Sequence, residues 1–218
     1  MGGVKGVLRR AVVLLGTLVG RLQVLVVTRR SGNRPVWVLD LDNTLADTWP
    51  SYLGRHASER ARLAGLEPLA GMLAAAYEPA RAAGARVVVL SHRNLWHWTV
   101  TRSWLRANGV DVGWAELVLV ASPNDKIAHL RRLCAGGREV TYWDDLTHGT
   151  ERGRHGSYED VVEAVRRLPL TYHGEAEIAA VVAAADPDRA ERVSALLAAA
   201  GITGAGDAPT GDAAPDGR

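Results

Sequence analysis

The chain contains very few cysteines, lysines and phenylalanines. Its 218 residues include one cysteine, Cys134, and no phenylalanine. One cysteine excludes an intrachain disulfide bond and any metal site built from several cysteines. Cys134 lies in the segment LRRLCAGG, where we expect a small buried side chain near a helix end rather than a catalytic thiol. Lys5 and Lys126 are the only lysines, so a lysine at a motif position is unusually informative.

The charge balance does not by itself favour a nucleic-acid-binding protein. The net charge is only +2, although the pI of 8.9 leaves that class open. With 47% hydrophobic residues, the chain can bury one good core. We expect one domain with appendages: an apolar and basic segment with a linker (1–34), a catalytic domain (35–170), a helical appendage (171–203) and a disordered tail rich in Gly, Pro, Ala and Asp (204–218).

The N-terminal segment allows two interpretations. Three basic residues precede the apolar run AVVLLGTLVG, an order typical of signal peptides and membrane anchors. However, Arg21 and Gln23 interrupt the apolar run, a central arginine costs roughly 2.5 to 3.5 kcal/mol on insertion scales, and no small-residue cleavage site is evident. The alternatives are membrane association through residues 4–27, or an amphipathic helix that covers the core of a cytoplasmic protein.

Two acidic residues follow the first predicted strand. Residues 36–39 form a short apolar run, as in a strand buried on both faces of a parallel sheet. Asp40 and Asp42 come where this strand ends, and Asn43 favours a turn there. We therefore expect both carboxylates at the carboxyl edge of the sheet, where open α/β folds bind ligands. One can attack a substrate while the other transfers a proton.

Two further strands end in polar residues that suit phosphate binding. Residues 87–90 form a second apolar strand, and the hydroxyl of Ser91 after it can donate a hydrogen bond to a phosphoryl oxygen. Residues 117–120 form a third strand, followed by a helix for which Ser122 is the expected N-cap. Lys126 falls in the first turn of that helix, from which its ammonium group can reach the strand ends.

A second acidic pair follows the fourth predicted strand. Residues 140–143 form this strand, and Asp144 and Asp145 end it. Carboxylates on a short loop suit Mg²⁺, which takes only one or two of them and keeps several waters. Response-regulator receivers also gather acids, a hydroxyl and a lysine at strand ends. In receivers, however, the acidic pair comes early and the lysine last, whereas here the acidic pair is last.

These four signals resemble the motifs of the haloacid dehalogenase superfamily of phosphoryl-transfer enzymes. Its motifs are DxDx[TV], a Ser or Thr, a Lys and paired acids, in this order. Asp40, Asp42 and Thr44 fit the first motif in full, and the resemblance extends from Pro35 to about Leu168. It implies an α/β fold, a Rossmannoid three-layer sandwich around a central parallel sheet, with a minimal cap or none. It also implies that strands one and four are neighbours at the topological switch point.

The resemblance implies a Mg²⁺-dependent phosphatase that forms an aspartyl-phosphate. Asp40 is then the nucleophile and Asp42 the acid and base, because an acid two residues after the nucleophile favours phosphatase or phosphotransferase over dehalogenase. Mg²⁺ is expected on Asp40, the backbone carbonyl of Asp42, Asp144 and Asp145. The substrate-binding candidates are Thr44, which also shapes the loop, together with Ser91, His92, Arg93 and Lys126.

Other functions stay open at this point. The partner is a phosphorylated substrate, which a nucleic-acid end or a phosphoprotein would satisfy. A polynucleotide or nucleotide phosphatase would use aromatic and basic residues near the crevice: Trp49, His92, Arg93, Arg152 and Arg154. A phosphotransferase would use an acceptor other than water. A non-enzymatic scaffold is disfavoured because every catalytic position is filled. The oligomeric state is open.

Two helical segments bear on the access to this site. The stretch after the first motif can supply only a small helical lid around residues 49–66, so we expect an open crevice. A second helix is expected from Asn94 to Asn108. Trp96, Val100 and Trp104 recur on one side of it, and that spacing predicts core packing rather than a platform for stacking bases.

Overall fold

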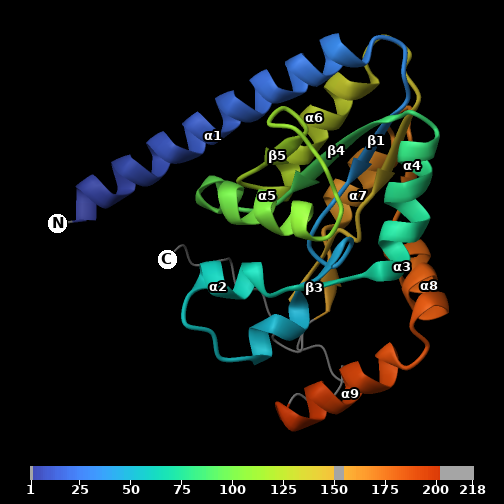
Figure 1. Ribbon diagram of the computed structural model, residues 1–218. Coiled ribbons are helices and arrows are strands. Elements are labelled where there is room, and N and C mark those ends of the chain that lie inside the picture. Colours follow the sequence, from blue (N-terminus) through green and yellow to red (C-terminus); the bar gives the residue numbers. More distant parts are fainter. Residues whose placement is uncertain (1, 150–154, 202–218) are drawn as a thin grey trace.

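The central sheet has five parallel strands, and the computed structural model describes residues 2–149 and 155–201. The strand order is β5-β4-β1-β6-β9, so β1 lies in the middle (Figure 1). The strands are β1 (Val36–Leu39), β4 (Arg86–Ser91), β5 (Leu117–Leu119), β6 (Val140–Trp143) and β9 (Thr171–His173). The four strands expected from the sequence are confirmed, as is the α/β class with a central parallel sheet.

Helices cover both faces of this sheet because its strands are apolar on both sides. Val36 and Val38 of β1 point into one buried cluster, whereas Leu39 belongs to the other. The first cluster lies under α1, α6 and α7, and the second lies under α3, α4, α5 and α8. The bounds of these helices are α1 (Gly2–Ser31), α3 (Ala70–Met72), α4 (Glu78–Ala82), α5 (Trp98–Ala107), α6 (Pro123–Cys134), α7 (Glu159–Arg166) and α8 (Glu175–Ala185).

The carboxyl-terminal half of α1 belongs to the core. Val24 and Val27 are fully buried, and the Gln23 side-chain amide donates hydrogen bonds to the backbone oxygens of Trp114 (2.7 Å) and Leu117 (2.8 Å). The helix ends at Ser31, so the linker predicted within residues 1–34 is shorter than expected from the sequence. This half of α1 therefore covers the core, which is the second of the two interpretations given for the N-terminal segment. No helix in the described part of the chain is long and apolar enough to span a bilayer.

The sheet extends beyond the predicted boundary at residue 170. Thr171–His173 pair with β6 as strand β9, although the sequence places them in the helical appendage. The sequence does not reveal this strand because it is short and partly polar. An edge strand tolerates polar residues, since only one of its sides is paired with a neighbouring strand. After α8, helix α9 (Arg189–Ala199) is tied to the domain by the Arg189–Asp47 ion pair (2.8 Å). The tail predicted over 204–218 lies outside the described residues.

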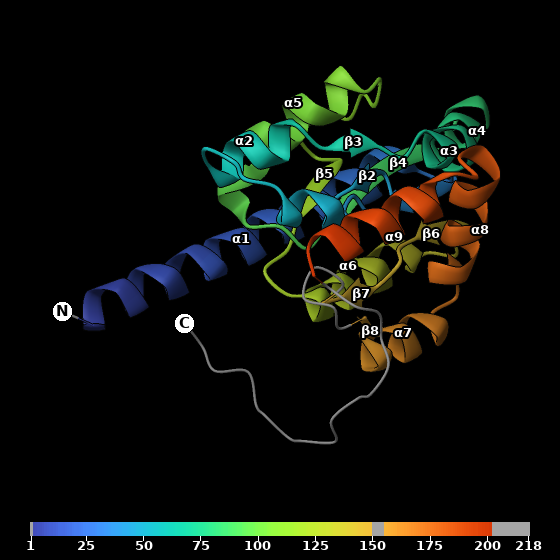
Figure 2. The same cartoon turned by 90° about the horizontal axis from the view of Figure 1, so that it is seen from below.

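A small helical lid follows β1, where the sequence predicts one. Strands β2 (Ala46–Asp47) and β3 (Glu67–Pro68) form an antiparallel pair at its base. Between them lie the 3₁₀ helix η1 (Trp49–Leu53) and α2 (Glu59–Ala64). Figure 2 shows the lid residues on one side of the molecule, with α9 near η1. The remaining elements are the π-helical turn η2 (Leu73–Tyr77), which joins α3 to α4, the 3₁₀ helix η3 (Leu95–His97), and the antiparallel pair β7 (Thr147–His148) and β8 (Gly156–Ser157).

The expected core stripe on the helix after Ser91 is only partly correct. Val100 and Trp104 are buried, but Trp96 is 63% exposed. The reason is that the α-helix begins at Trp98, and Trp96 lies in the preceding turn η3, which has a different helical phase.

Candidate active site

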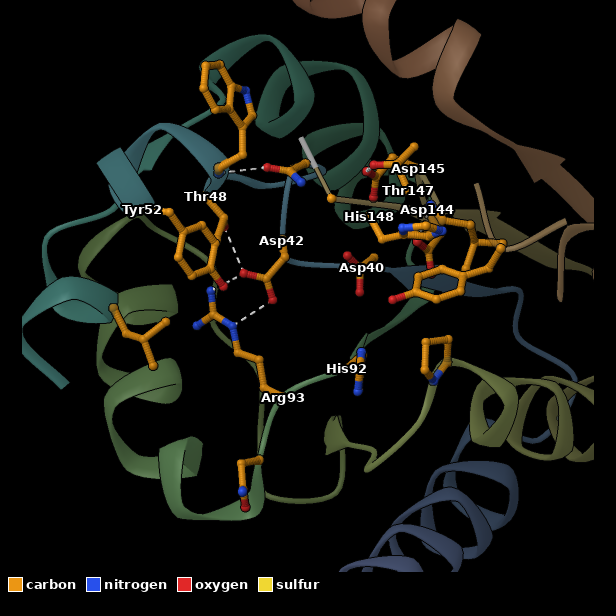
Figure 3. Close-up of a pocket in the computed structure, with 18 of the residues that line it drawn as sticks. Asp40, Asp42, Thr48, Tyr52, His92, Arg93, Asp144, Asp145, Thr147 and His148 are labelled. Carbon is orange, nitrogen blue, oxygen red and sulfur yellow. Dashed lines mark hydrogen bonds and ion pairs between the residues drawn. The ribbon is translucent and has the colours of Figure 1, made fainter. Parts of the chain in front are cut away.

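The acidic pairs of β1 and β6 meet at one edge of the sheet. Strands β1 and β6 are hydrogen-bonded neighbours in parallel register, so Asp40 and Asp144 leave the sheet side by side. Chain order reverses between these two strands, which makes the crevice above them a topological switch point. The cavity there has a volume of about 320 Å³ (Figure 3). Its wall includes Asp40, Asp42, His92, Arg93, Lys126, Asp144 and Asp145.

Sharp turns after each strand aim these carboxylates at the cavity. Asn43 has a φ of +58°, a left-handed conformation that asparagine tolerates better than most residues. Its side-chain oxygen also accepts a hydrogen bond from the Trp49 amide (3.1 Å). Leu146 has a φ of +48°, which is unusual for a bulky residue, and its amide donates to Oδ1 of Asp144 (2.9 Å). The hydrogen bonds at these two turns therefore hold the acidic loops in place.

One half of the site is organised around Lys126, and we call it the lysine cluster. The Lys126 ammonium donates to Oδ1 of Asp40 (2.7 Å) and to Oδ2 of Asp144 (2.6 Å). All three side chains are buried. The Tyr142 hydroxyl also donates to Asp144, and the Thr147 hydroxyl donates to Asp145. Ser122 caps α6 as predicted, which places Lys126 in its first turn.

The lysine cluster has more negative than positive groups. Burial raises the pKa of Asp40 well above its usual value, and the nearby Asp144 raises it further, while Lys126 opposes both effects. Burial and Asp144 also raise the pKa of Asp145 to about 7. Burial would lower the pKa of Lys126, but Asp144 and Asp40 outweigh it and the pKa is raised, so the ammonium stays charged. A further cation near these acids would relieve their repulsion.

The other half of the site is organised around Arg93, and we call it the arginine cluster. Its guanidinium forms two hydrogen bonds to Asp42, from Nε to Oδ2 (2.7 Å) and from a terminal nitrogen to Oδ1 (2.6 Å) (Figure 3). Asp42 also accepts hydrogen bonds from Thr48 (2.8 Å) and Ser91 (3.1 Å). Burial alone would raise the pKa of Asp42, but Arg93 and the two hydroxyls outweigh it and lower the pKa.

Three carboxylates are close enough to share a metal ion. Oxygen atoms of Asp40, Asp144 and Asp145 lie within 4.8 Å of one another, and all three residues are buried. A set of oxygen donors with no nitrogen or sulfur suits a hard dication. Burial and the neighbouring Asp144 raise the pKa values of Asp40 and Asp145 despite the opposing charge of Lys126. The residues therefore fit a divalent cation.

Two of the predicted substrate-binding residues do not reach the cavity. Ser91 is fully buried, and its hydroxyl donates to Asp42. Thr44 is also fully buried, and its hydroxyl has no hydrogen-bond partner among the described residues. Thr44 forms part of the turn after Asp42. His92 and Arg93 do line the cavity, although Arg93 is engaged by Asp42.

Sequence reasoning missed several residues of the site. Thr48 binds Asp42 from the start of the lid, and Tyr142 reaches Asp144 from within β6. A tyrosine two residues before an acid on a strand shares its face, a signal that the sequence does offer. No comparable sequence signal exists for Thr48, because a turn of the chain brings it back to Asp42, six residues earlier. Arg152 and Arg154, candidates for nucleic-acid contacts, lie outside the described residues.

The lid residues at the mouth of the cavity are held in place by one another. Arg62 forms two hydrogen bonds to Glu59 (2.8 and 2.6 Å). Its guanidinium also lies 4.0 Å from the centre of the Tyr52 ring. Trp49 is buried, so it offers no face for stacking a base.

No protein-family model, curated protein or solved structure matches the chain.

Proposed function

We propose that the protein is a phosphoric monoester hydrolase of the haloacid dehalogenase type, dependent on Mg²⁺, with Asp40 as the nucleophile. One observation carries the proposal. Asp40 and Asp42 come from one loop and line one cavity together with Lys126, Asp144 and Asp145. One carboxylate can then attack phosphorus while the other transfers a proton. The pKa of Asp40 is raised and that of Asp42 is lowered, the reverse of what a nucleophile and an acid need, so the proposal requires a bound cation that would favour the ionised form of Asp40.

The strand order supports the same proposal. Numbered along the chain, the parallel strands run 3-2-1-4-5 across the sheet. Both this order and the 2-1-3-4-5 order of receiver domains are doubly wound, but the two differ in the position of the first strand. The position of Lys126 at the start of α6 also agrees with the superfamily's third motif.

In the proposed reaction, an Asp40 carboxylate oxygen bonds to phosphorus while the bond from phosphorus to the ester oxygen breaks. Asp42 gives a proton to the leaving oxygen and later takes one from the water that hydrolyses the aspartyl-phosphate. The lowered pKa of Asp42 favours its ionised form, which suits the second step. For the first step, the incoming phosphate must compete with Asp42 for Arg93, which allows Asp42 to be protonated.

Lys126 and the acids of the lysine cluster have separate roles in this scheme. Lys126 keeps Asp40 pointed at the cavity and faces the transferring oxygens with its charge. Asp40, Asp144 and Asp145 would hold Mg²⁺, together with the Asp42 carbonyl that the superfamily resemblance implies. When bound, the ion would neutralise charge between the nucleophile and the phosphate.

A polynucleotide phosphatase is less well supported. Trp49 is buried and Arg93 is paired with Asp42, so neither is available for the base and phosphate contacts expected of them.

The test is hydrolysis of p-nitrophenyl phosphate by the full chain, with Mg²⁺ and with excess EDTA. We expect turnover only with Mg²⁺, and we expect Asp40→Asn to reduce kcat on the order of 10⁴-fold or more. The matched control is Asp111→Asn, the same change at an exposed aspartate outside the cavity. Acid quenching with labelled substrate should trap phosphate on the wild-type protein and not on Asp40→Asn. Turnover close to normal in Asp40→Asn would overturn the proposal.

A further inference from the structure

Helix α1 carries a row of exposed leucines between residues 14 and 25. Leu14, Leu18, Leu22 and Leu25 recur at intervals of four and three residues, which places them on one side of the helix. Leu18 is 62% exposed and Leu22 is 51% exposed. Figure 1 shows that the helix extends from the domain towards the N-terminus, beyond the other elements. A contiguous exposed apolar surface of this kind marks an interaction site.

The opposite side of α1 is anchored in the domain. Gln23, Val24 and Val27 are buried against the core, and the Gln23 amide is bound to two backbone oxygens near β5. The helix therefore has two apolar sides, one against the protein and one exposed. Because Gln23 and both valines are held by the domain, this part of α1 is fixed with its leucine row facing outward.

Two exposed tryptophans lie on segments next to α1. Trp96 is 63% exposed, and its neighbour Leu95 lies 4.0 Å from the position of a Cβ on Gly16. Trp114 is 46% exposed, and its backbone oxygen accepts the Gln23 hydrogen bond. Indole rings favour the boundary between water and lipid, because they combine an apolar body with a polar N–H. Both tryptophans lie on segments that contact the anchored side of α1, so they add exposed aromatic surface beside the helix rather than within the leucine row.

The charge of α1 is entirely positive. Its sequence contains six basic residues and no acidic one: Lys5, Arg9, Arg10, Arg21, Arg29 and Arg30. Arg21 and Arg29 are exposed, and their helical positions lie beside or in line with the leucine row. Arg21 also lines a cavity of about 220 Å³ between α1 and α6, with His129, Arg132 and one acid, Asp125. Arginines beside exposed leucines are the pattern of helices that lie on anionic membranes.

We propose that α1 docks the protein onto an anionic phospholipid surface. The leucine row enters the boundary between headgroups and acyl chains, the arginines contact the phosphates, and the helix lies in the plane of the membrane. Charge complementarity favours this partner over a second copy of the chain. Two such helices side by side would bring twelve positive charges together, and these charges would repel one another. The proposal is independent of the phosphatase activity, since docking uses none of the residues around the cavity.

Flotation of the full-length protein with lipid vesicles tests the proposal. We expect it to float with vesicles of phosphatidylcholine and phosphatidylglycerol, to float much less with phosphatidylcholine alone, and to be released by high salt. The double variant Leu18→Glu/Leu22→Glu should weaken binding at least about tenfold, because both leucines leave the membrane and two negative charges are added. The matched control is Leu196→Glu, since Leu196 on α9 is 45% exposed and lies outside this surface.

A milder pair of substitutions guards against misfolding. Leu18→Ser/Leu22→Ser should also weaken binding while leaving the circular dichroism melting curve close to that of the wild type, because both side chains are exposed. Absence of vesicle binding by the wild type would overturn the proposal. The same holds if the wild type binds neutral vesicles as well as anionic ones, or if both leucine variants bind anionic vesicles as well as the wild type does. A dimer in light scattering that these variants dissociate, without vesicle binding, would instead assign the surface to a second copy.

Discussion

The lysine cluster and the arginine cluster treat two neighbouring aspartates in opposite ways. Lys126 is shared between two buried carboxylates, with a third beside them, so acids outnumber the cation and the pKa of Asp40 is raised. Arg93 serves Asp42 alone, with two hydroxyls in support, and the pKa of Asp42 is lowered. The difference between the two clusters is the ratio of cations to carboxylates. The lysine cluster could hold a further cation among its three carboxylates, whereas Arg93 already pairs with the single carboxylate of the arginine cluster.

The largest expected effect comes from removing the central cation of each cluster. Lys126→Met leaves buried carboxylates without their partner, so we expect a loss of about 3–5 kcal/mol in the free energy of unfolding and a loss of turnover on the order of 10³-fold. Arg93→Met leaves Asp42 partly exposed and still bound by Thr48 and Ser91, so its cost should be about 1–3 kcal/mol. Urea unfolding measures both. An equal or larger cost for Arg93→Met would contradict the comparison.

The next effect separates the chemical roles of the two acids. Asp42→Asn should reduce kcat/KM by about 10²–10³-fold with an alkyl phosphate, and much less with p-nitrophenyl phosphate, because kcat/KM reports the step in which the leaving group departs and a good leaving group needs little protonation. Asp40→Asn should abolish turnover of both substrates, since the nucleophile is needed for each. Steady-state kinetics with a series of leaving groups measures the dependence. If Asp42→Asn affects all leaving groups equally, Asp42 does not act as the acid.

The smallest effect is a pH dependence of stability in the lysine cluster. The pKa of Asp145 is about 7 in the folded protein and about 3.9 in an unfolded chain. Between about pH 4 and pH 7, the folded state keeps a proton on Asp145 that the unfolded state has lost. The free energy of unfolding therefore falls as the pH rises through this range. Asp145→Asn cannot ionise, so in EDTA its Tm should gain on the wild type across this pH range.

Magnesium should reverse that ranking. With Mg²⁺ present, the wild type gains a bound ion that stabilises the fold, while Asp145→Asn lacks one of the three ligands. Differential scanning fluorimetry in EDTA and in Mg²⁺ measures both differences. A Tm difference that is independent of both pH and Mg²⁺ would show that Asp145 neither carries the raised pKa nor binds the ion.

The sequence predicts the charged residues of the site better than their partners. Asp40, Asp144 and Lys126 each directly follow a strand or begin a helix, so strand order alone brings them together. Thr48 and the two-point contact of Arg93 with Asp42 depend on how two turns fold back, which local patterns do not encode. For the same reason, Ser91 is predicted to face the substrate but is oriented towards Asp42 by a contact with a distant segment.

The same limit explains the errors in the fold. Strands buried on both faces are visible as apolar runs, so β1 and β4 are predicted nearly to the residue. Strand β9 has only one paired edge and two partly exposed residues, so its sequence resembles a loop. Ser157 pairs with Thr147 in the short strand β8, and α7 begins only at Glu159.

The central position of β1 has a consequence for how the chain folds. Its two neighbours start at Arg86 and Val140, so neither edge of β1 is covered until long stretches of chain have been made. Pairings between such distant segments slow folding, and an unpaired apolar strand promotes aggregation while it waits. During synthesis, β1 stays open on one side until β6 leaves the ribosome. Chains truncated before Val140 would therefore expose that edge, and we expect them to depend on chaperones.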